Sequence, residues 1–382
     1  MPNRISRPYI FFFLLAICLI TKATAQQYHL FVGTYTSGSS EGIYVFKFDG
    51  NTGNAIPADT VRNIENPSYL AITNDGKNLY AVTENGGGKP GMVNAFSFDQ
   101  QKGKLILLNQ KESKGDHPCY ITVSNNRKWV IAGNYSGGNL VAYATNSDGS
   151  LSDRLQLIGH SGRSVNKDRQ ESPHVHSTNI TPDQKYLLVP DLGIDKIMTY
   201  QFNSNAQRNP LQPAVVPFTA IKPGGGPRHL AFHPNGKWVY LMEELSGHVS
   251  VWTYKNGKLN FVQEIDAHAE NFKGERGSAD IHVSPDGRHV YASNRGGANN
   301  LAIFKADPRN GRLSLAGFQD VLGNTPRNFT IEPGGKFVLV ANQDSGNITV
   351  FSRDAATGLL TPTQTTIHVD HPVCLQLLPI KN

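Results

Sequence analysis

Cysteine is scarce in this sequence: three occur in 382 residues, and one of them, Cys18, lies in the apolar N-terminal segment. The other two, Cys119 and Cys374, are too few for a disulfide framework and form no Cys-x-x-Cys metal signature. A disulfide requires Cα atoms within about 7 Å. Because the two cysteines fall on predicted strands of repeat units that are not neighbours, we expect two buried free thiols.

Long hydrophobic runs are absent except in the first 25 residues. Met1 to Ala25 has basic residues at Arg4 and Arg7, an apolar core from Tyr9 to Ile20, and the small-x-small end Ala23-Thr24-Ala25. This pattern predicts a secretory signal peptide (residues 1–25) cleaved after Ala25, and hence a periplasmic or secreted protein. The core is too short for a comfortable membrane span, so we expect none after cleavage.

A strong excess of charge of either sign is also missing. Of the 36 basic residues, Arg4, Arg7 and Lys22 lie in the predicted leader, which leaves 33 against 30 acidic residues. A near-neutral mature chain gives no reason to expect nucleic acid as a partner. No GxxxxGK[ST] phosphate loop and no serine nucleophile elbow is present. No feature signals oligomerisation, so we expect a monomer.

What the sequence does contain is an internal repeat of about 50 residues. Six copies share an apolar strand, a tight turn of the Asp/Asn-Gly-Lys/Arg type, a second strand and a Gly-rich loop, as in GPRHLAFHPNGKWVYLMEELSG and GSADIHVSPDGRHVYASNRGG. The equivalent turn positions are Gly76, Arg127, Gln184, Gly236, Gly287 and Gly335, spaced 51, 57, 52, 51 and 48 residues apart. A period of this size with several strands per unit predicts an all-β fold, a β-propeller.

The seventh unit is split between the two ends of the chain. HPVCLQLLP (371–379) repeats the first strand, and HLFVGTYTSGSSEGIYVFKFD (29–49) supplies the second and third strands. Joining the ends in one blade would close the ring and remove its free edges. Residues 26–382 are 357 residues, 51 for each of seven blades, which predicts a single seven-bladed domain with no room for a second.

When the repeat units are aligned, each set of equivalent positions forms a column. Two columns are predicted to meet at one mouth of the central channel, because the start of the first strand and the end of the second strand lie at the same end of a blade. That mouth is the default ligand site. The first column is Ser68, Cys119, His176, Arg228, Ala279 and Arg327. The second column is Glu84, Tyr135, Leu192, Glu244, Arg295 and Gln343. Neighbouring blades therefore contribute His176, Arg228, Glu244 and Arg295 to one face.

Charged side chains at such positions are costly to bury unless they are paired. The cluster is therefore either a salt-bridge network that joins blades or a site for an anionic substrate. Arg327 is open to the same two interpretations, as a salt-bridge partner at the mouth or as a third anion contact. A slip of one residue in register would turn Glu243 inward in place of Glu244.

At these residues the chain resembles the seven-bladed propeller lactonase family, which includes propeller-type 6-phosphogluconolactonases and carboxy-cis,cis-muconate lactonizing enzymes. The resemblance runs from about Tyr28 to Pro379, and its marks are FVGTYT, VHSTNITPD, GPRHLAFHPNGKWVYLMEELS and SPDGRHVYASNRG. The family's active-site His, Arg, Glu and Arg match His176, Arg228, Glu244 and Arg295 one for one. The resemblance implies hydrolysis of a lactone, a cyclic ester.

Such a hydrolysis needs a nucleophilic water, a stabilised oxyanion and a proton for the leaving ring oxygen. His176 suits a general base at neutral pH. Glu244 would orient Arg228 or a water, or relay a proton, so either His176 or Glu244 could be the base. Arg228 and Arg295, with Arg327 as the further contact, offer guanidinium groups to a substrate carboxylate or phosphate and to the oxyanion.

Metal is the main alternative that the residues raise. His174 and His176 could form half of a zinc site, but no third ligand stands at suitable spacing. A second-strand column resembles the oxygen-rich ring of calcium-dependent propeller lactonases: Thr83, Asn134, Asp191, Glu243, Asn294 and Asn342. Polar strand ends are also ordinary turn chemistry. We expect this column to be structural, and we expect no metal and no cofactor.

The predicted function is 6-phosphogluconolactonase-like hydrolysis of a sugar lactone or another anionic lactone. A signal peptide argues against a cytosolic phosphorylated intermediate as the everyday substrate, and favours an unphosphorylated aldonolactone or a carboxylated lactone. Two alternatives stay open. One is a lactonizing cycloisomerase that holds a muconate-type dicarboxylate with the same arginines, and the other is a propeller that binds a ligand or a protein without catalysis.

Overall fold

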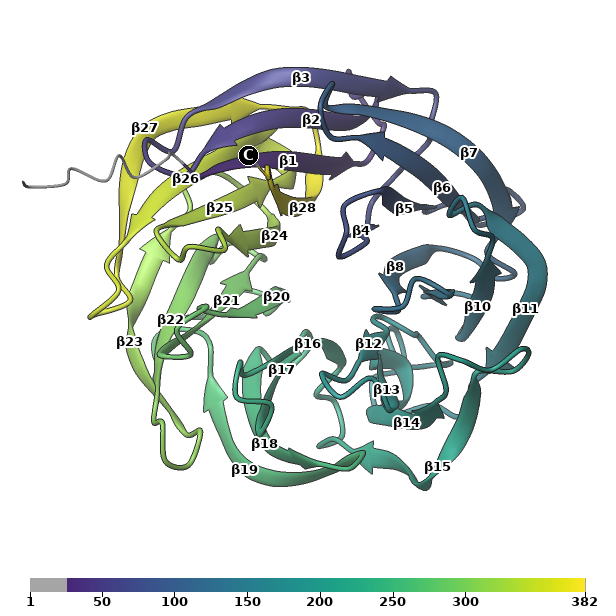
Figure 1. Ribbon diagram of the computed structural model, residues 1–382. Helices are drawn as coiled ribbons and strands as arrows, with labels where there is room; N and C mark the ends of the chain where they lie inside the picture. Colours follow the sequence, from purple (N-terminus) through teal and green to yellow (C-terminus); the bar gives the residue numbers. More distant parts are fainter. Residues whose placement is uncertain (1–25, 382) are drawn as a thin grey trace, which may run out of the picture.

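Seven four-stranded antiparallel sheets form a ring in the computed structural model, which describes residues 26–381 (Figure 1). Each sheet is one blade, with its first strand on the channel and its fourth at the rim. The seven-bladed β-propeller predicted from the repeat is thereby confirmed. The predicted signal peptide lies outside the described residues.

The innermost strands are β28 (Pro372–Pro379), β4 (Leu70–Ile72), β8 (Pro118–Val123), β12 (Asn179–Ile180), β16 (Pro227–Phe232), β20 (Ser278–Val283) and β24 (Pro326–Ile331). The second strands are β1 (Gln27–Thr34), β5 (Asn78–Thr83), β9 (Trp129–Asn134), β13 (Tyr186–Asp191), β17 (Trp238–Glu243), β21 (His289–Asn294) and β25 (Phe337–Asn342).

The third strands are β2 (Gly42–Asp49), β6 (Met92–Asp99), β10 (Asn139–Thr145), β14 (Lys196–Phe202), β18 (His248–Lys255), β22 (Asn300–Ala306) and β26 (Asn347–Arg353). The rim strands are β3 (Ala55–Arg62), β7 (Lys104–Glu112), β11 (Leu151–Gly159), β15 (Leu211–Ala220), β19 (Lys258–Asp266), β23 (Leu313–Asp320) and β27 (Leu360–His368). Two short 3-10 turns, Leu192–Ile194 and Gln343–Ser345, follow β13 and β25.

The turn between the first and second strands requires a left-handed residue at one position. In all six complete repeats the predicted turn position has φ between 56° and 76°, including Arg127 and Gln184, which are not glycine. Only glycine adopts this conformation without cost, so the four glycines in this column are explained by backbone geometry. The turn that defines the repeat is therefore the same in each blade.

The ring closes through the blade that both ends of the chain share. β28 pairs with β1 in antiparallel register from Tyr28↔Pro379 to Thr34↔Pro372, and β1 pairs with β2. This confirms the closure predicted from the split repeat. Neither Cys374 in β28 nor Cys119 in β8 forms a disulfide, and both thiols are buried, as expected.

The hydrophobic core is divided into seven clusters, one between each pair of neighbouring blades. Phe48 of the closing blade, for example, packs edge-on against Phe337 of the preceding one. Tyrosines on the second strands also donate hydrogen bonds to a turn glycine of the next blade. These pairs are Tyr80 to Gly149, Tyr240 to Gly311 and Tyr291 to Gly358, at 2.8, 3.1 and 2.6 Å. Stability thus depends on an unbroken ring of interfaces.

Candidate active site

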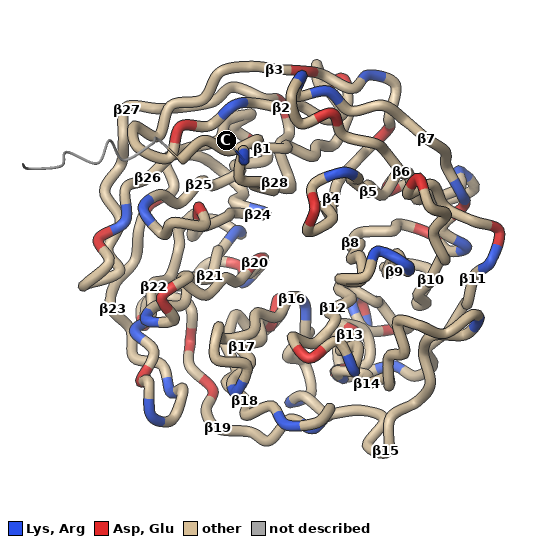
Figure 2. Tube along the Cα trace, viewed as in Figure 1, with Lys and Arg blue, Asp and Glu red and all other residues tan. Residues whose placement is uncertain are grey.

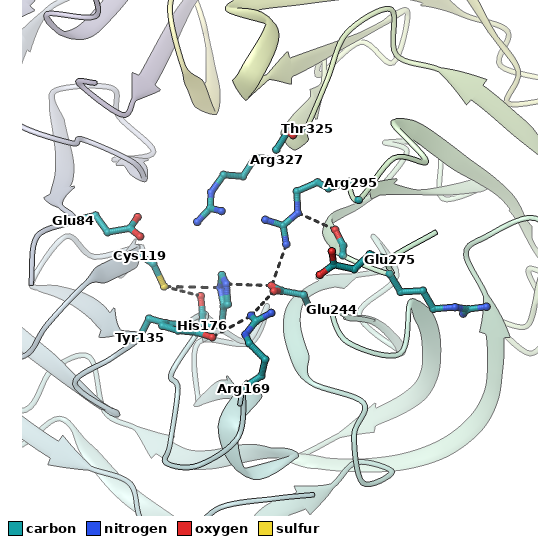
Figure 3. Close-up of a pocket in the computed structure, with 13 residues that line it drawn as sticks. Glu84, Cys119, Tyr135, Arg169, His176, Glu244, Glu275, Arg295, Thr325 and Arg327 are labelled. Carbon is teal, nitrogen blue, oxygen red and sulfur yellow. Dashed lines mark hydrogen bonds and ion pairs between the residues drawn. The ribbon is translucent and has the colours of Figure 1, made fainter. Parts of the chain in front are cut away.

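A pocket of about 530 Å³ lies where the two predicted columns meet (Figure 3). The first column contributes Cys119, His176 and Arg327, and the second contributes Glu84, Tyr135, Glu244 and Arg295. Arg228 and Ser68 line a smaller cavity directly beneath it. Ala279, Leu192 and Gln343 are not among the lining residues. Figure 2 shows that charged residues of both signs lie on the inner strands as well as around the rim.

A β-bulge at the start of the inner strand explains how the first column reaches the pocket. In β8, β16 and β24 the pairing register shifts between the proline and the residue two positions later. The shift leaves Cys119, Arg228 and Arg327 without a partner in the ladder. An extra residue of this kind bends the strand and redirects a side chain, and such bulges are common beside active sites.

Glu244 is the centre of the charge cluster. Its carboxylate accepts a hydrogen bond from Arg228 Nε at 2.8 Å and from Arg169 Nη2 at 2.7 Å, and Arg295 Nη2 lies 3.3 Å away. Burial alone would raise the pKa of Glu244, but Arg295 and Arg228 outweigh it and hold that pKa well below its ordinary value. Glu244 is therefore a fixed anion at neutral pH.

His176 lies beside this anion and is itself buried. Its Nε2 is 3.7 Å from Glu244 Oε2, too far for a direct hydrogen bond. Burial lowers the pKa of His176 well below its ordinary value, and the positive charge of Arg228 adds to the effect. The imidazole is consequently neutral and able to accept a proton across the physiological pH range.

Cys119 packs against the same histidine. Its Sγ lies 3.8 Å from His176 Nδ1, and its thiol also faces the His176 carbonyl oxygen at 3.5 Å. Burial raises the pKa of this thiol far above the ordinary range. Because a thiol must ionise to become a strong nucleophile, Cys119 is chemically inert here.

The neighbouring glutamate faces away from the pocket. Glu243 accepts a hydrogen bond from Ser246 Oγ at 3.0 Å, and it does not line the cavity. Burial raises its pKa to about 7. The predicted register, with Glu244 inward, is therefore the one that the strand adopts.

Two arginines of the cluster, Arg295 and Arg228, lie at different depths in the channel. Arg295 lines the pocket and donates from Nε to the Gly277 carbonyl at 2.8 Å, and burial lowers its pKa to about 10. Arg228 is 2% exposed and lies below Glu244, where its Nη1 donates to the carbonyl of Ala279 at 2.6 Å. Its Nη2 makes no hydrogen bond to any residue that the structure describes.

Arg327 enters the pocket from the side opposite His176 and Arg169, as Figure 3 shows. Its guanidinium lies over the Tyr35 ring, 5.3 Å from the centroid, and makes no hydrogen bond within residues 26–381. Tyr35 in turn donates to Glu84 at 3.0 Å. Burial would lower the pKa of Arg327, but Tyr35 and Glu84 raise it, so the group remains cationic. Its donors are available to a ligand.

Six pocket residues lie outside the sequence columns: Arg169, Glu275, Arg276, Gly277, Gly296 and Thr325. Arg169 is the one of these that bonds Glu244. It lies on the connection between β11 and β12 (160–178), and its Nη2 is also 3.3 Å from the Tyr135 hydroxyl. The one feature of the sequence that indicated an extended connection here was the long spacing of 57 residues between the turns at Arg127 and Gln184. That excess length forms the loop that brings Arg169 over the pocket.

Metal ligation finds no support in the geometry. Among residues 26–381, no group of three or more His, Cys, Asp and Glu side chains is placed to hold an ion. His174 Nδ1 faces the Tyr135 carbonyl at 3.1 Å. The asparagines of the second-strand column bond loop carbonyls instead: Asn134 to Ser113, Asn294 to Ala267 and Asn342 to Val321. These side chains join each blade to the connection that follows the rim strand of the preceding blade.

Comparison with known proteins agrees with the fold. The family model described as "Lactonase, 7-bladed beta-propeller" matches residues 29–377. The chain belongs to the seven-bladed β-propeller lactonase family. Among its relatives is a 6-phosphogluconolactonase of Formosa agariphila, 38% identical over 334 residues that cover 87% of this chain and 94% of the relative. Another is a 6-phosphogluconolactonase of Bacillus subtilis, 34% identical, covering 92% and 99%.

A solved structure of a lactonase is equally similar. The periplasmic gluconolactonase of Pseudomonas aeruginosa superposes with a TM-score of 0.88 and 38% identity, covering 93% of this chain and all of that one. As a member of the family, this chain is a lactonase, an enzyme that hydrolyses a cyclic carboxylic ester. No helix in the described part of the lactonase is long and apolar enough to cross a membrane.

Proposed function

We propose that this lactonase hydrolyses a sugar lactone in the pocket at the channel mouth, with His176 as the general base. The observation that carries this proposal is the pairing of a neutral, buried imidazole with Glu244, a carboxylate that three arginines hold ionised. The Glu244 carboxylate already accepts hydrogen bonds from Arg228 and Arg169, whereas His176 Nε2 accepts none from the described residues. The division of roles follows: His176 moves the proton, and Glu244 stabilises the imidazolium that forms.

The reaction needs only water besides the lactone. A water held between His176 Nε2 and Glu244 Oε2 attacks the ester carbonyl carbon as His176 takes its proton, and the carbonyl electron pair moves to the oxygen. Arg295 faces that oxyanion from the pocket wall. When the tetrahedral intermediate collapses, the bond from carbon to the ring oxygen breaks and the imidazolium returns its proton to that oxygen. The product is the open hydroxy acid.

The arginines favour a substrate that carries negative charge. Arginines outnumber glutamates at or directly beneath the pocket, five to three: Arg169, Arg228, Arg276, Arg295 and Arg327 against Glu84, Glu244 and Glu275. We assign Arg327 to the end of the substrate away from the ester, because its donors are unengaged. Arg228 contributes its Nη2 from the floor. This arrangement needs no metal and no cofactor.

We further propose that the protein works in the periplasm or is secreted, as a monomer. The leader pattern of Met1 to Ala25 supports the location, as does similarity to a gluconolactonase described as periplasmic. The everyday substrate is then an unphosphorylated aldonolactone or a carboxylated lactone.

The test is hydrolysis of 6-phosphogluconolactone and glucono-1,5-lactone by the mature protein, with EDTA present and absent and with spontaneous ring opening subtracted. We expect turnover that survives EDTA, and a loss of about 10²- to 10⁴-fold in kcat for His176→Ala without loss of folding. No turnover of either lactone, with turnover of a muconate, would replace hydrolysis with the cycloisomerase. Tight binding without turnover, indifferent to His176→Ala, would indicate a binding protein.

A further inference from the structure

A second layer of polar side chains lies directly beneath the pocket. The bulged inner strands place two successive residues around the small lower cavity, Arg228 with His229 and Arg327 with Asn328. Asp280 of β20 adjoins them and is 2% exposed, while His229 is 5% exposed. The proposed lactonase mechanism uses neither His229 nor Asp280, so a buried ionised carboxylate in this place requires an explanation.

Asp280 is fully engaged. Its Oδ1 accepts from His229 Nδ1 at 2.8 Å and from the backbone N–H of Ile281 at 3.0 Å. Its Oδ2 accepts from His282 Nε2 at 2.9 Å and from the Asn328 side chain. Burial alone would raise the pKa of Asp280, but His282 and His229 outweigh it and hold the pKa far below its ordinary value. Asp280 is thus a fixed acceptor.

The fixed acceptor determines the tautomer of His229. A carboxylate only accepts hydrogen bonds, so His229 Nδ1 must carry a proton. Burial and the adjacent Arg228 lower the pKa of His229 to about 4, so the ring is neutral and its Nε2 has a free lone pair. Arg228 Nη1 lies 3.3 Å from that nitrogen, within reach to donate to it. With the other tautomer, two N–H groups would face each other.

Arg228 is thereby held by three acceptors, Glu244 at Nε and the Ala279 carbonyl and His229 at Nη1. The remaining Nη2 makes no hydrogen bond to the described residues, and Arg228 lines the small cavity beneath the pocket. We propose that His229 and Asp280 are a positioning pair that fixes the guanidinium of Arg228, and through it the Glu244 carboxylate, for lactone hydrolysis. This role rests on the proposed function, and it extends the site by one layer into the channel.

The test compares variants that remove or keep a hydrogen-bond acceptor at the position of His229 Nε2, opposite Arg228 Nη1. His229→Leu removes it, and we expect kcat/KM on the lactone to fall about 10- to 100-fold, as a small misplacement of a site group can cause. His229→Gln can place an amide oxygen near the same point, and we expect it to recover most of the activity. In an Arg228→Met background, His229→Leu should cause no further loss, because its effect passes through Arg228.

His282 supplies the matched control. It bonds the other oxygen of Asp280 and, within residues 26–381, makes no hydrogen bond to Arg228. If the pair positions Arg228, His282→Leu changes the melting temperature without a comparable change in kcat/KM. If the cluster only stabilises the fold, His229→Leu and His282→Leu have matching effects on melting and neither reduces the activity of folded protein, which overturns the proposal.

A measurement independent of catalysis is the ¹⁵N NMR spectrum of the histidine imidazoles. We expect the His229 ring to be neutral with its proton on Nδ1, and Arg228→Met to leave that tautomer unchanged. A proton on Nε2 would overturn the positioning role even if the enzyme hydrolyses lactones. Conversely, this tautomer together with no lactone turnover in the wild-type protein would remove the proposed function and leave the Asp280–His229 geometry intact.

Discussion

Single residues in this pocket are defined by their charged neighbours more than by their own chemistry. Glu243 and Glu244 are adjacent in the chain, yet burial raises the pKa of Glu243 to about 7 while arginines hold that of Glu244 well below its ordinary value. The sequence columns predicted that Glu244 faces inward. They left open whether His176 or Glu244 is the base, because a pKa depends on burial and on partners from other blades.

The pH dependence of kcat/KM should report the His176 imidazole. Its pKa is lowered in the fold, so the neutral, base-competent form persists as the pH falls through 6.5 and is lost only at lower pH. We therefore expect kcat/KM for glucono-1,5-lactone to stay level from pH 8 to below 6.5 and to decrease further down. An acid limb centred at or above pH 6.5 would contradict this assignment. The His176→Ala variant, which lacks the imidazole, provides the baseline pH profile of kcat/KM.

Arg327 should determine the preference for charged lactones. Arg327→Gln removes the unengaged cation, and we expect the KM for 6-phosphogluconolactone to rise at least about tenfold with little change in kcat, since a charged hydrogen bond contributes about 1.5–3 kcal/mol. The KM for neutral glucono-1,5-lactone should change much less. Arg327→Lys keeps the charge, so its KM for 6-phosphogluconolactone should lie between those of the wild-type protein and Arg327→Gln. An equal effect on both lactones would refute a role in charge recognition.

Two local elements bring these residues together. The bulge in the inner strand directs the first-column side chains to the pocket, and the long connection before β12 places Arg169 above Glu244. The proline before the bulge and the extra length of the loop are both visible in the sequence. Their consequence is not, because no residue type marks a bulge and the path of a loop depends on what it packs against.

The connection 160–178 should influence catalysis more than stability. The side chain of Arg169 is 41% exposed, and without it the Glu244 carboxylate keeps two arginine partners, Arg228 and Arg295. We expect Arg169→Gln to raise KM several-fold while the melting temperature changes by only a few degrees. Arg163→Gln on the same connection, where the side chain is exposed, is the control and should leave both unchanged. Equal kinetics for the two variants would exclude Arg169 from substrate binding.

At the scale of the whole molecule, the ring is closed by one strand. β28 is the inner strand of the blade that begins the chain, and its Val373, Cys374 and Leu375 are buried. Without it, β1 would present an unpaired edge, and the packing between the first and last blades would lose its inner layer.

Deletion of residues 373–382 should therefore open the propeller. We expect loss of the cooperative thermal transition, or a large drop in melting temperature, together with aggregation in size-exclusion chromatography. Deletion of Lys381 and Asn382 alone, which lie beyond β28, is the control and should behave as the full-length protein. A truncated protein that melts like the full-length one would show that the ring does not depend on this strand.

The pattern of residues along the chain predicts the number of blades, the strand order, the shared closing blade and the two columns that supply most of the pocket. These features follow from local rules: strand alternation, a left-handed turn position and a fixed repeat length. Tertiary packing alone places Arg228 beneath Glu244, brings Arg169 over that carboxylate and sets the tautomer of His229 through Asp280. Arg228 and Glu244 belong to one blade, but the Arg169–Glu244 and His229–Asp280 contacts join residues 75 and 51 positions apart. They depend on how the blades pack, which no local pattern encodes.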